Sequence, residues 1–251
     1  MASNKLQLNE DKTEVLLIHS QYKNLSETCP NSLMLGDSEI KFSKEARNLG
    51  VTFTDTLDMN KHINNICRSA YCELRKISSV RHLLSNEDTQ TLVCSYVLSK
   101  LDYCNALFSN LSKTHIDKLQ KVQNSAARLI FKLKRIEHIK PFLKELHWLP
   151  ISLRIQYKVA LFCYKSLYDS KFPDYISNLL HIYKPSRNLR SANDNKIFIV
   201  PKFEKSFGKR SFTHAAPLFW NALPFEIRHA QSEAIFKKSL KTHLFRSFYG
   251  T

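Results

Sequence analysis

Glycine is scarce in this chain of 251 residues, which contains only Gly36, Gly50, Gly208 and Gly250. Nucleotide-binding proteins often hold phosphate with the glycine-rich loops G-x-G-x-x-G or G-x-x-x-x-G-K, and neither motif occurs in this sequence. The scarcity excludes those two motifs. Together with long stretches of apolar residues at intervals of three and four, it favours helices.

Paired cysteines and long apolar runs are also missing. The six cysteines include no C-x-x-C pair. His62, Cys67 and Cys72 follow one another at steps that turn roughly 140° around a helix, so they cannot converge on one metal ion. No apolar run approaches the roughly 20 residues that span a bilayer, and no signal-peptide pattern is present. The sequence predicts a soluble, intracellular protein with reduced thiols, no metal site, no cofactor and no membrane partner.

Acidic residues are few after Leu57. The whole chain has 38 Lys and Arg against 22 Asp and Glu, which gives a net charge of +16 and a pI near 9.6. The segment up to Leu57 carries a net charge of −2, so the remainder carries +18. An excess of this size indicates a polyanionic partner, nucleic acid or an anionic membrane surface. A solvated, lysine-rich surface is the alternative.

Short strands are predicted in the first 57 residues. The apolar run at 14–19 has the length of a strand, and 33–35 and 39–42 form a hairpin around a turn at Gly36-Asp37. A further strand is predicted at 49–53.

Helical periodicity begins at Asp58. Ser85 and Ser112 are predicted to cap the second and third helices, which run to about Phe108 and Leu133, and Pro150 introduces a fourth helix at 151–168. Residues 184–210 are turn-rich with one strand candidate at 197–200, and helical periodicity returns from Phe212 and ends with 232–248. We therefore expect a mainly α fold with a small N-terminal β portion (an α+β fold), divided at 1–57, 58–135 and 136–251.

Two of these helices have basic residues opposite their apolar stripes. At about 100° per residue, the basic side chains of the first and third helices fall on the outer faces, where few acidic residues occur. Ridges of this kind suit contact with a phosphate backbone and do not read base sequence. The predicted nucleic-acid-binding residues are Lys61, Arg68, Arg75, Lys118, Lys121, Arg128, Lys132 and Arg135.

Catalytic patterns are not found. Two-metal phosphoryl transfer needs carboxylates that hold two ions about 3.5–4 Å apart. The acidic pairs Glu10-Asp11 and Glu87-Asp88 follow no apolar strand and are better explained by a helix end and a helix cap. Asp102 is predicted mid-helix, and His147 beside Trp148 is more typical of a packed histidine than of a general base.

Several strings, spread from the first residue to about Phe248, resemble the C-terminal part of the reverse transcriptases of non-LTR (LINE-type, jockey-like) retrotransposons. Asn9-Glu10-Asp11-Lys12-Thr13 resembles their fourth palm motif, and 49–55 resembles their primer-grip region. The other matching strings, in order, are SKLDYCNALF, LQKVQNSAARLI, LHWLPISLRI, RNLRSA and PLFWNALPFEIR.

The resemblance implies a palm tail up to about Asp55, a thumb over 58–134 that holds a primer–template duplex, and a C-terminal extension. Lys12 matches the palm-motif lysine, and Leu49, Gly50 and Val51 would contact the primer end. Full-length relatives use Mg²⁺. No Phe/Tyr-Ala-Asp-Asp string occurs and the family's endonuclease domain is absent, so we expect a fragment without polymerase activity of its own. Its expected partners are an RNA–DNA hybrid or RNA, and a palm-containing polymerase chain that it could complete in trans. A domesticated helical module that binds protein is the further alternative.

Overall fold

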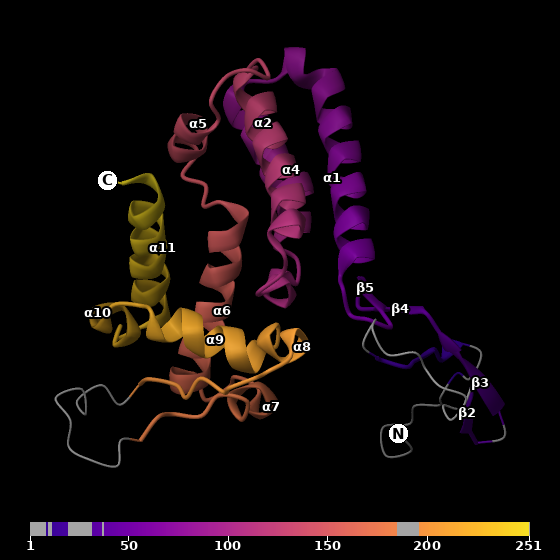
Figure 1. The fold of residues 1–251 in the computed structure, drawn as a ribbon. Helices are drawn as coiled ribbons and strands as arrows, with labels where there is room; N and C mark the ends of the chain where they lie inside the picture. The colour runs from indigo at the N-terminus through magenta and orange to yellow at the C-terminus, as the bar shows by residue number, and fades with distance from the viewer. Residues whose placement is uncertain (1–8, 10–11, 20–31, 37, 185–195, 251) are drawn as a thin grey trace. The chain divides into compact units, whose positions relative to one another are not determined.

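Helices dominate the computed structural model, which describes residues 9, 12–19, 32–36, 38–184 and 196–250 (Figure 1). In these ranges the strands all precede Asp55. The predicted mainly α fold with a small N-terminal β portion is therefore confirmed. The contacts divide the chain into two compact units, Met1–Ile66 and Cys67–Thr251.

The first unit contains two small sheets. In one, β3 (Ser38–Ser43) lies between β1 (Val15–Leu16), which is parallel to it, and β2 (Ser32–Leu35), which is antiparallel. The predicted hairpin is confirmed, because Leu35 pairs with Ser38 across the turn. The strand predicted at 14–19 is shorter than expected, since β1 finds pairing partners only in Phe42 and Ser43.

The second sheet is a hairpin of β4 (Glu45–Asn48) and β5 (Val51–Thr54), in which Asn48 pairs with Val51. Leu49 and Gly50 form its two-residue turn, with φ of 46° and 82°. Positive φ at both turn positions matches the right-handed twist of the strands. The prediction of a strand over 49–53 was wrong at its start, and β4 was missed because its Glu-Ala-Arg-Asn sequence lacks β-branched or aromatic residues.

A buried histidine, His62, is hydrogen-bonded to the backbone of this hairpin. The Nδ1 atom of His62 accepts a hydrogen bond from the Thr52 amide at 3.4 Å. Burial, and then the positive charge of Arg47, lower the pKa of His62 below its ordinary value of 6.5. Near pH 7 the imidazole of His62 is therefore neutral in the folded unit.

We expect the hairpin to weaken in mild acid. Because the folded pKa lies below the unfolded one, the contribution of His62 is complete above pH 6.5 and is lost as the pH falls from there through the folded pKa. The slope is at most about 1.4 kcal/mol per pH unit. Protection of the β5 amides against hydrogen exchange measures this, with His62→Gln as the control that lacks the dependence. Equal pH dependence in both proteins would contradict the prediction.

Helix α1 (Asn60–Val80) begins in the first unit, and the second unit contains its remainder and the helices that follow. Their bounds, in chain order, are η3 (Arg81–Leu83), α2 (Asn86–Val93), the π-helix η4 (Cys94–Leu98), α3 (Ser99–Asp102), η5 (Asn105–Phe108), α4 (Lys113–Phe131), α5 (Lys140–Glu145), α6 (Ile151–Tyr168), α7 (Asp174–Ser177), α8 (Ser206–Lys209), α9 (Phe212–Asn221), α10 (Phe225–Arg228) and α11 (Glu233–Tyr249). The predicted bounds of α6 are confirmed, and those of α11 differ by one residue at each end.

Three predicted helix ends were wrong. The first helix starts at Asn60, two residues after the expected Asp58. The second ends at Asp102 and not at Phe108, because Cys104 takes a left-handed conformation with φ of 51°. The third helix ends at Phe131, since Lys132 also takes a left-handed conformation, with φ of 54°. Neither position is a glycine, so no residue typical of a helix stop marks these ends.

One of the two predicted helix N-caps is confirmed and the other is not. The Ser85 hydroxyl accepts the Asp88 amide at 3.0 Å, which confirms the cap of α2. The Ser112 hydroxyl instead bonds to the side chains of Thr114 and His115, so the prediction of a backbone cap there was wrong.

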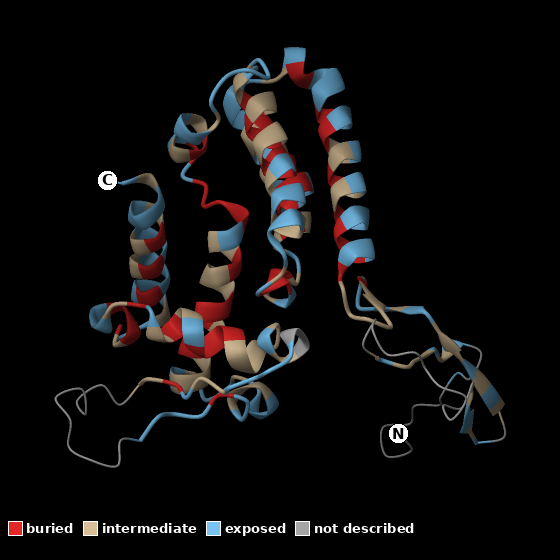
Figure 2. Cartoon of the chain, viewed as in Figure 1, coloured by how far each residue is buried: buried red, intermediate tan, exposed pale blue. Residues whose placement is uncertain are grey.

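The core of the second unit is arranged around α6, which packs against α4, α9 and α11. Buried residues recur along the inner side of each of these helices (Figure 2). Trp220 is completely buried, and its Nε1 donates to the Lys196 carbonyl at 2.6 Å. Trp148 is buried two residues before Pro150, the N-cap of α6. Of the turn-rich segment expected at 184–210, residues 185–195 lie outside the described residues. The strand candidate at 197–200 contributes one bridge, Ile182 to Phe198.

Candidate nucleic-acid interface

Helices α1 and α4 run side by side and parallel in the second unit (Figure 1). Near one end, burial raises the pKa of the Cys67 thiol and the neighbouring Lys118 ammonium opposes that shift. Near the other end, Arg81 directly after α1 donates from Nε to the Leu129 carbonyl at 3.0 Å and from Nη2 to the Ile130 carbonyl at 2.7 Å. The hydrogen bonds from Arg81 join the C-terminal ends of the two helices.

Four of the predicted cations lie along the exposed edge where α1 and α4 meet. Arg68 and Arg75 are two turns apart on the outer face of α1, one step around the helix from Cys67. Lys118 lies beside Cys67, and Lys121 is one turn further along α4. All four side chains belong to exposed residues. We call Arg68, Arg75, Lys118 and Lys121 the cationic strip.

The nearby carboxylates do not neutralise this edge. Glu73 lies roughly 140° around α1 from Arg68 and pairs with Lys100 at 3.2 Å and with Lys76 at 3.4 Å. The hydrogen bond from Lys100 is the main cause that lowers the pKa of Glu73. Asp117 is exposed and lies one turn before Lys121 on α4. The strip therefore carries four cations with one exposed carboxylate beside it.

Three other cations that were predicted on the third helix do not belong to the cationic strip. Arg128 donates from Nη2 to the Glu137 carbonyl at 3.1 Å and to the Arg135 carbonyl at 3.5 Å, so it holds the loop that follows α4. Lys132 terminates the helix, and Arg135 lies beyond it. The prediction that these two residues continue the helical ridge was wrong, because the helix ends at Phe131.

The remaining predicted site residues belong to the first unit. Lys61 forms an ion pair with Glu45 of β4. The Lys12 amide donates to the Asn9 side chain at 3.1 Å. In the β4–β5 hairpin, Leu49 is exposed and Val51 is buried. Their roles toward a primer stay predictions.

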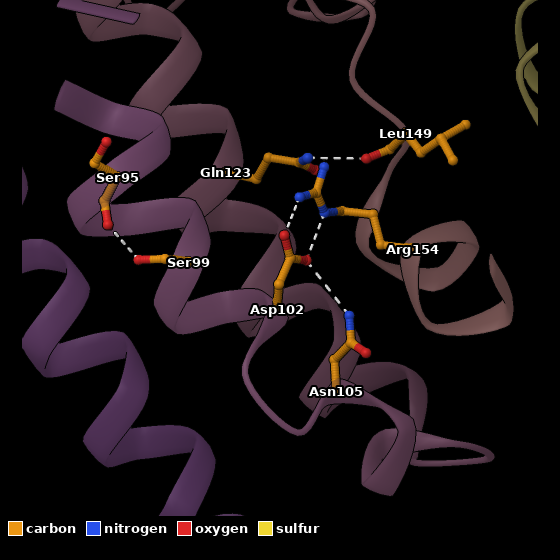
Figure 3. Close-up of polar contacts among 7 residues, drawn as sticks. All are labelled: Ser95, Ser99, Asp102, Asn105, Gln123, Leu149 and Arg154. Carbon is orange, nitrogen blue, oxygen red and sulfur yellow. Dashed lines mark hydrogen bonds and ion pairs between the residues drawn. The ribbon is translucent and has the colours of Figure 1, made fainter. Parts of the chain in front are cut away.

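A second polar cluster joins α3, α4 and α6 (Figure 3). Arg154 of α6 makes a two-pronged contact with Asp102, donating from Nε to Oδ1 at 2.8 Å and from Nη2 to Oδ2. Asn105 donates to the same carboxylate at 3.4 Å. Gln123 of α4 donates to the Leu149 carbonyl at 2.9 Å. Sequence reasoning found no role for Asp102, because its partner lies 52 residues away.

A scan against models of protein families found no match, and neither did searches of curated proteins and of solved structures. Among the described residues, no group of three or more His, Cys, Asp or Glu side chains is placed to hold a metal ion. Within the same ranges, every helix is too short or too polar to pass through a bilayer.

Proposed function

We propose that this chain binds nucleic acid without regard to base sequence, by laying a phosphate backbone along the cationic strip. It would act as the thumb does in the reverse transcriptases that its sequence resembles, and it would hold the strand without adding nucleotides to it. The observation that carries the proposal is the placement of Arg68, Arg75, Lys118 and Lys121 along one edge of two parallel helices.

The spacing of the strip fits a nucleic-acid backbone. Arg68 and Arg75 are separated by about 10 Å along α1, given a rise of about 1.5 Å per residue. That distance corresponds to about three nucleotides of a duplex strand along its axis. Flexible cationic side chains at such intervals can follow successive phosphates and make no contact with base edges.

Salt dependence tests the proposal. Four phosphate contacts should make the affinity of the chain for an RNA–DNA hybrid fall roughly 100-fold between about 50 and 200 mM salt. Replacing all four residues of the strip with glutamine should remove most of that dependence and weaken binding strongly at the lower salt concentration. Fluorescence anisotropy with a labelled hybrid gives both quantities.

A control of equal charge separates the strip from the overall positive charge. Lys171, Lys202, Lys205 and Lys209 are exposed lysines elsewhere in the second unit, and their replacement by glutamine removes the same four charges. This control should keep nearly the wild-type salt slope. If it loses as much affinity as the strip variant, binding depends on net charge alone and the proposal is wrong.

A further inference from the structure

A cavity of about 440 Å³ lies in the second unit beside the Asp102–Arg154 pair. Arg154 and Lys158 line it from successive turns of α6, and Lys241 lines it from α11. Asp102 is the one carboxylate among its lining residues. Three cations against one anion give the cavity a positive charge.

That charge is not cancelled by other acids. Only two of the five N–H donors of a guanidinium are used where Arg154 binds Asp102. Among the described residues, Lys158 and Lys241 form no ion pair. Lys165 and Lys237 on the same two helices show the contrast, because both pair with Glu233, at 3.5 and 2.6 Å.

The remaining lining residues include apolar and aromatic side chains and a buried amide. Trp148 and Leu149 are buried there, and Tyr157 lines the cavity from α6. Asn105 is almost completely buried, and its Oδ1 has no hydrogen-bond donor among the described residues. A buried acceptor without a donor is uncommon in folded proteins.

We propose that this cavity binds a single nucleotide, with the phosphate on Lys158, Lys241 and Arg154 and the base against the Tyr157 and Trp148 wall. Its volume falls within the range of small-molecule sites, roughly 300–1,000 Å³. A bare phosphate would leave the aromatic wall unused. The nucleotide can be free or can be the phosphorylated end of a strand, since both present the same chemistry. The cavity shares no residue with the cationic strip, so the two proposals can fail separately.

Isothermal titration calorimetry with adenosine monophosphate tests this site. We expect a dissociation constant in the micromolar to low millimolar range, and at least tenfold weaker binding by the variant Lys158→Gln/Lys241→Gln. The matched control Lys165→Gln/Lys238→Gln removes one charge from each of the same two helices and should bind within about twofold of wild type. The strip variant should also bind normally.

Two further ligands define what is recognised. Adenosine and inorganic phosphate should each bind at least tenfold more weakly than the monophosphate, and equal binding of inorganic phosphate would overturn the assignment to a nucleotide. A 5′-phosphorylated trinucleotide that binds more tightly than the monophosphate identifies a strand end as the ligand, and weaker binding identifies the free nucleotide. No heat with the monophosphate at several millimolar, in a protein whose circular dichroism shows it to be folded, would refute the site.

Discussion

Arg81→Ala is expected to lower the free energy of unfolding by about 3–5 kcal/mol, because it leaves several buried acceptors without donors at once. Arg81 is 6% exposed. Its guanidinium binds the carbonyls of Leu84, Leu129 and Ile130 and the side chain of Asn86. Two of these carbonyls belong to the last turn of α4, where no backbone amide of the helix is available to bond them.

Urea denaturation followed by circular dichroism measures this change. Arg81→Lys should fall between wild type and alanine, since an ammonium keeps the charge but cannot reach all four acceptors. Arg75→Ala on the exposed face of α1 is the control and should change stability by less than about 0.5 kcal/mol. A loss below about 1 kcal/mol for Arg81→Ala would show that water replaces the guanidinium.

Trp220→Ala should destabilise the second unit by about 3–5 kcal/mol, the range for removal of a buried aromatic side chain. The indole is 0% exposed and packs with its ring centroid 5.9 Å from that of Phe198 and 5.8 Å from that of Phe236. It also donates its N–H to the Lys196 carbonyl. The alanine variant therefore creates a cavity and removes a partly buried hydrogen bond.

Trp220→Phe separates these two contributions. Phenylalanine fills most of the space, so this variant should lose only about 1–2 kcal/mol, mainly for the unpaired carbonyl. Thermal and urea unfolding of both variants give the comparison. Equal losses for phenylalanine and alanine would mean that the hydrogen bond, and not the packing, dominates at this position.

Local chemistry explains which parts of the fold could be predicted from the sequence. The bounds of α6 follow from Pro150 and an unbroken apolar period, and the start of α2 follows from the Ser85 cap. The ends of α3 and α4 could not be predicted in this way. Cys104 and Lys132 are held in the left-handed conformation by their surroundings, although neither residue favours it.

For the candidate interface too, local patterns could be predicted and long-range contacts could not. Periodicity alone indicated that Arg68, Arg75, Lys118 and Lys121 lie on outer helix faces. Their placement along one edge depends on the bonds from Arg81 to carbonyls 48 and 49 residues away, and a single sequence contains no signal for contacts at that distance. The contacts of Arg128 with the loop after α4 could not be predicted either, because they depend on the end of the helix at Phe131.

The parallel arrangement of α1 and α4 has an electrostatic consequence at the end where both helices stop. Each helix carries about half a negative charge at its C-terminus, so two parallel neighbours place these partial charges close together. Arg81 follows the last residue of α1 and binds the last turn of α4, so one guanidinium offsets both helix dipoles. The field of the pair is thereby screened at its negative end.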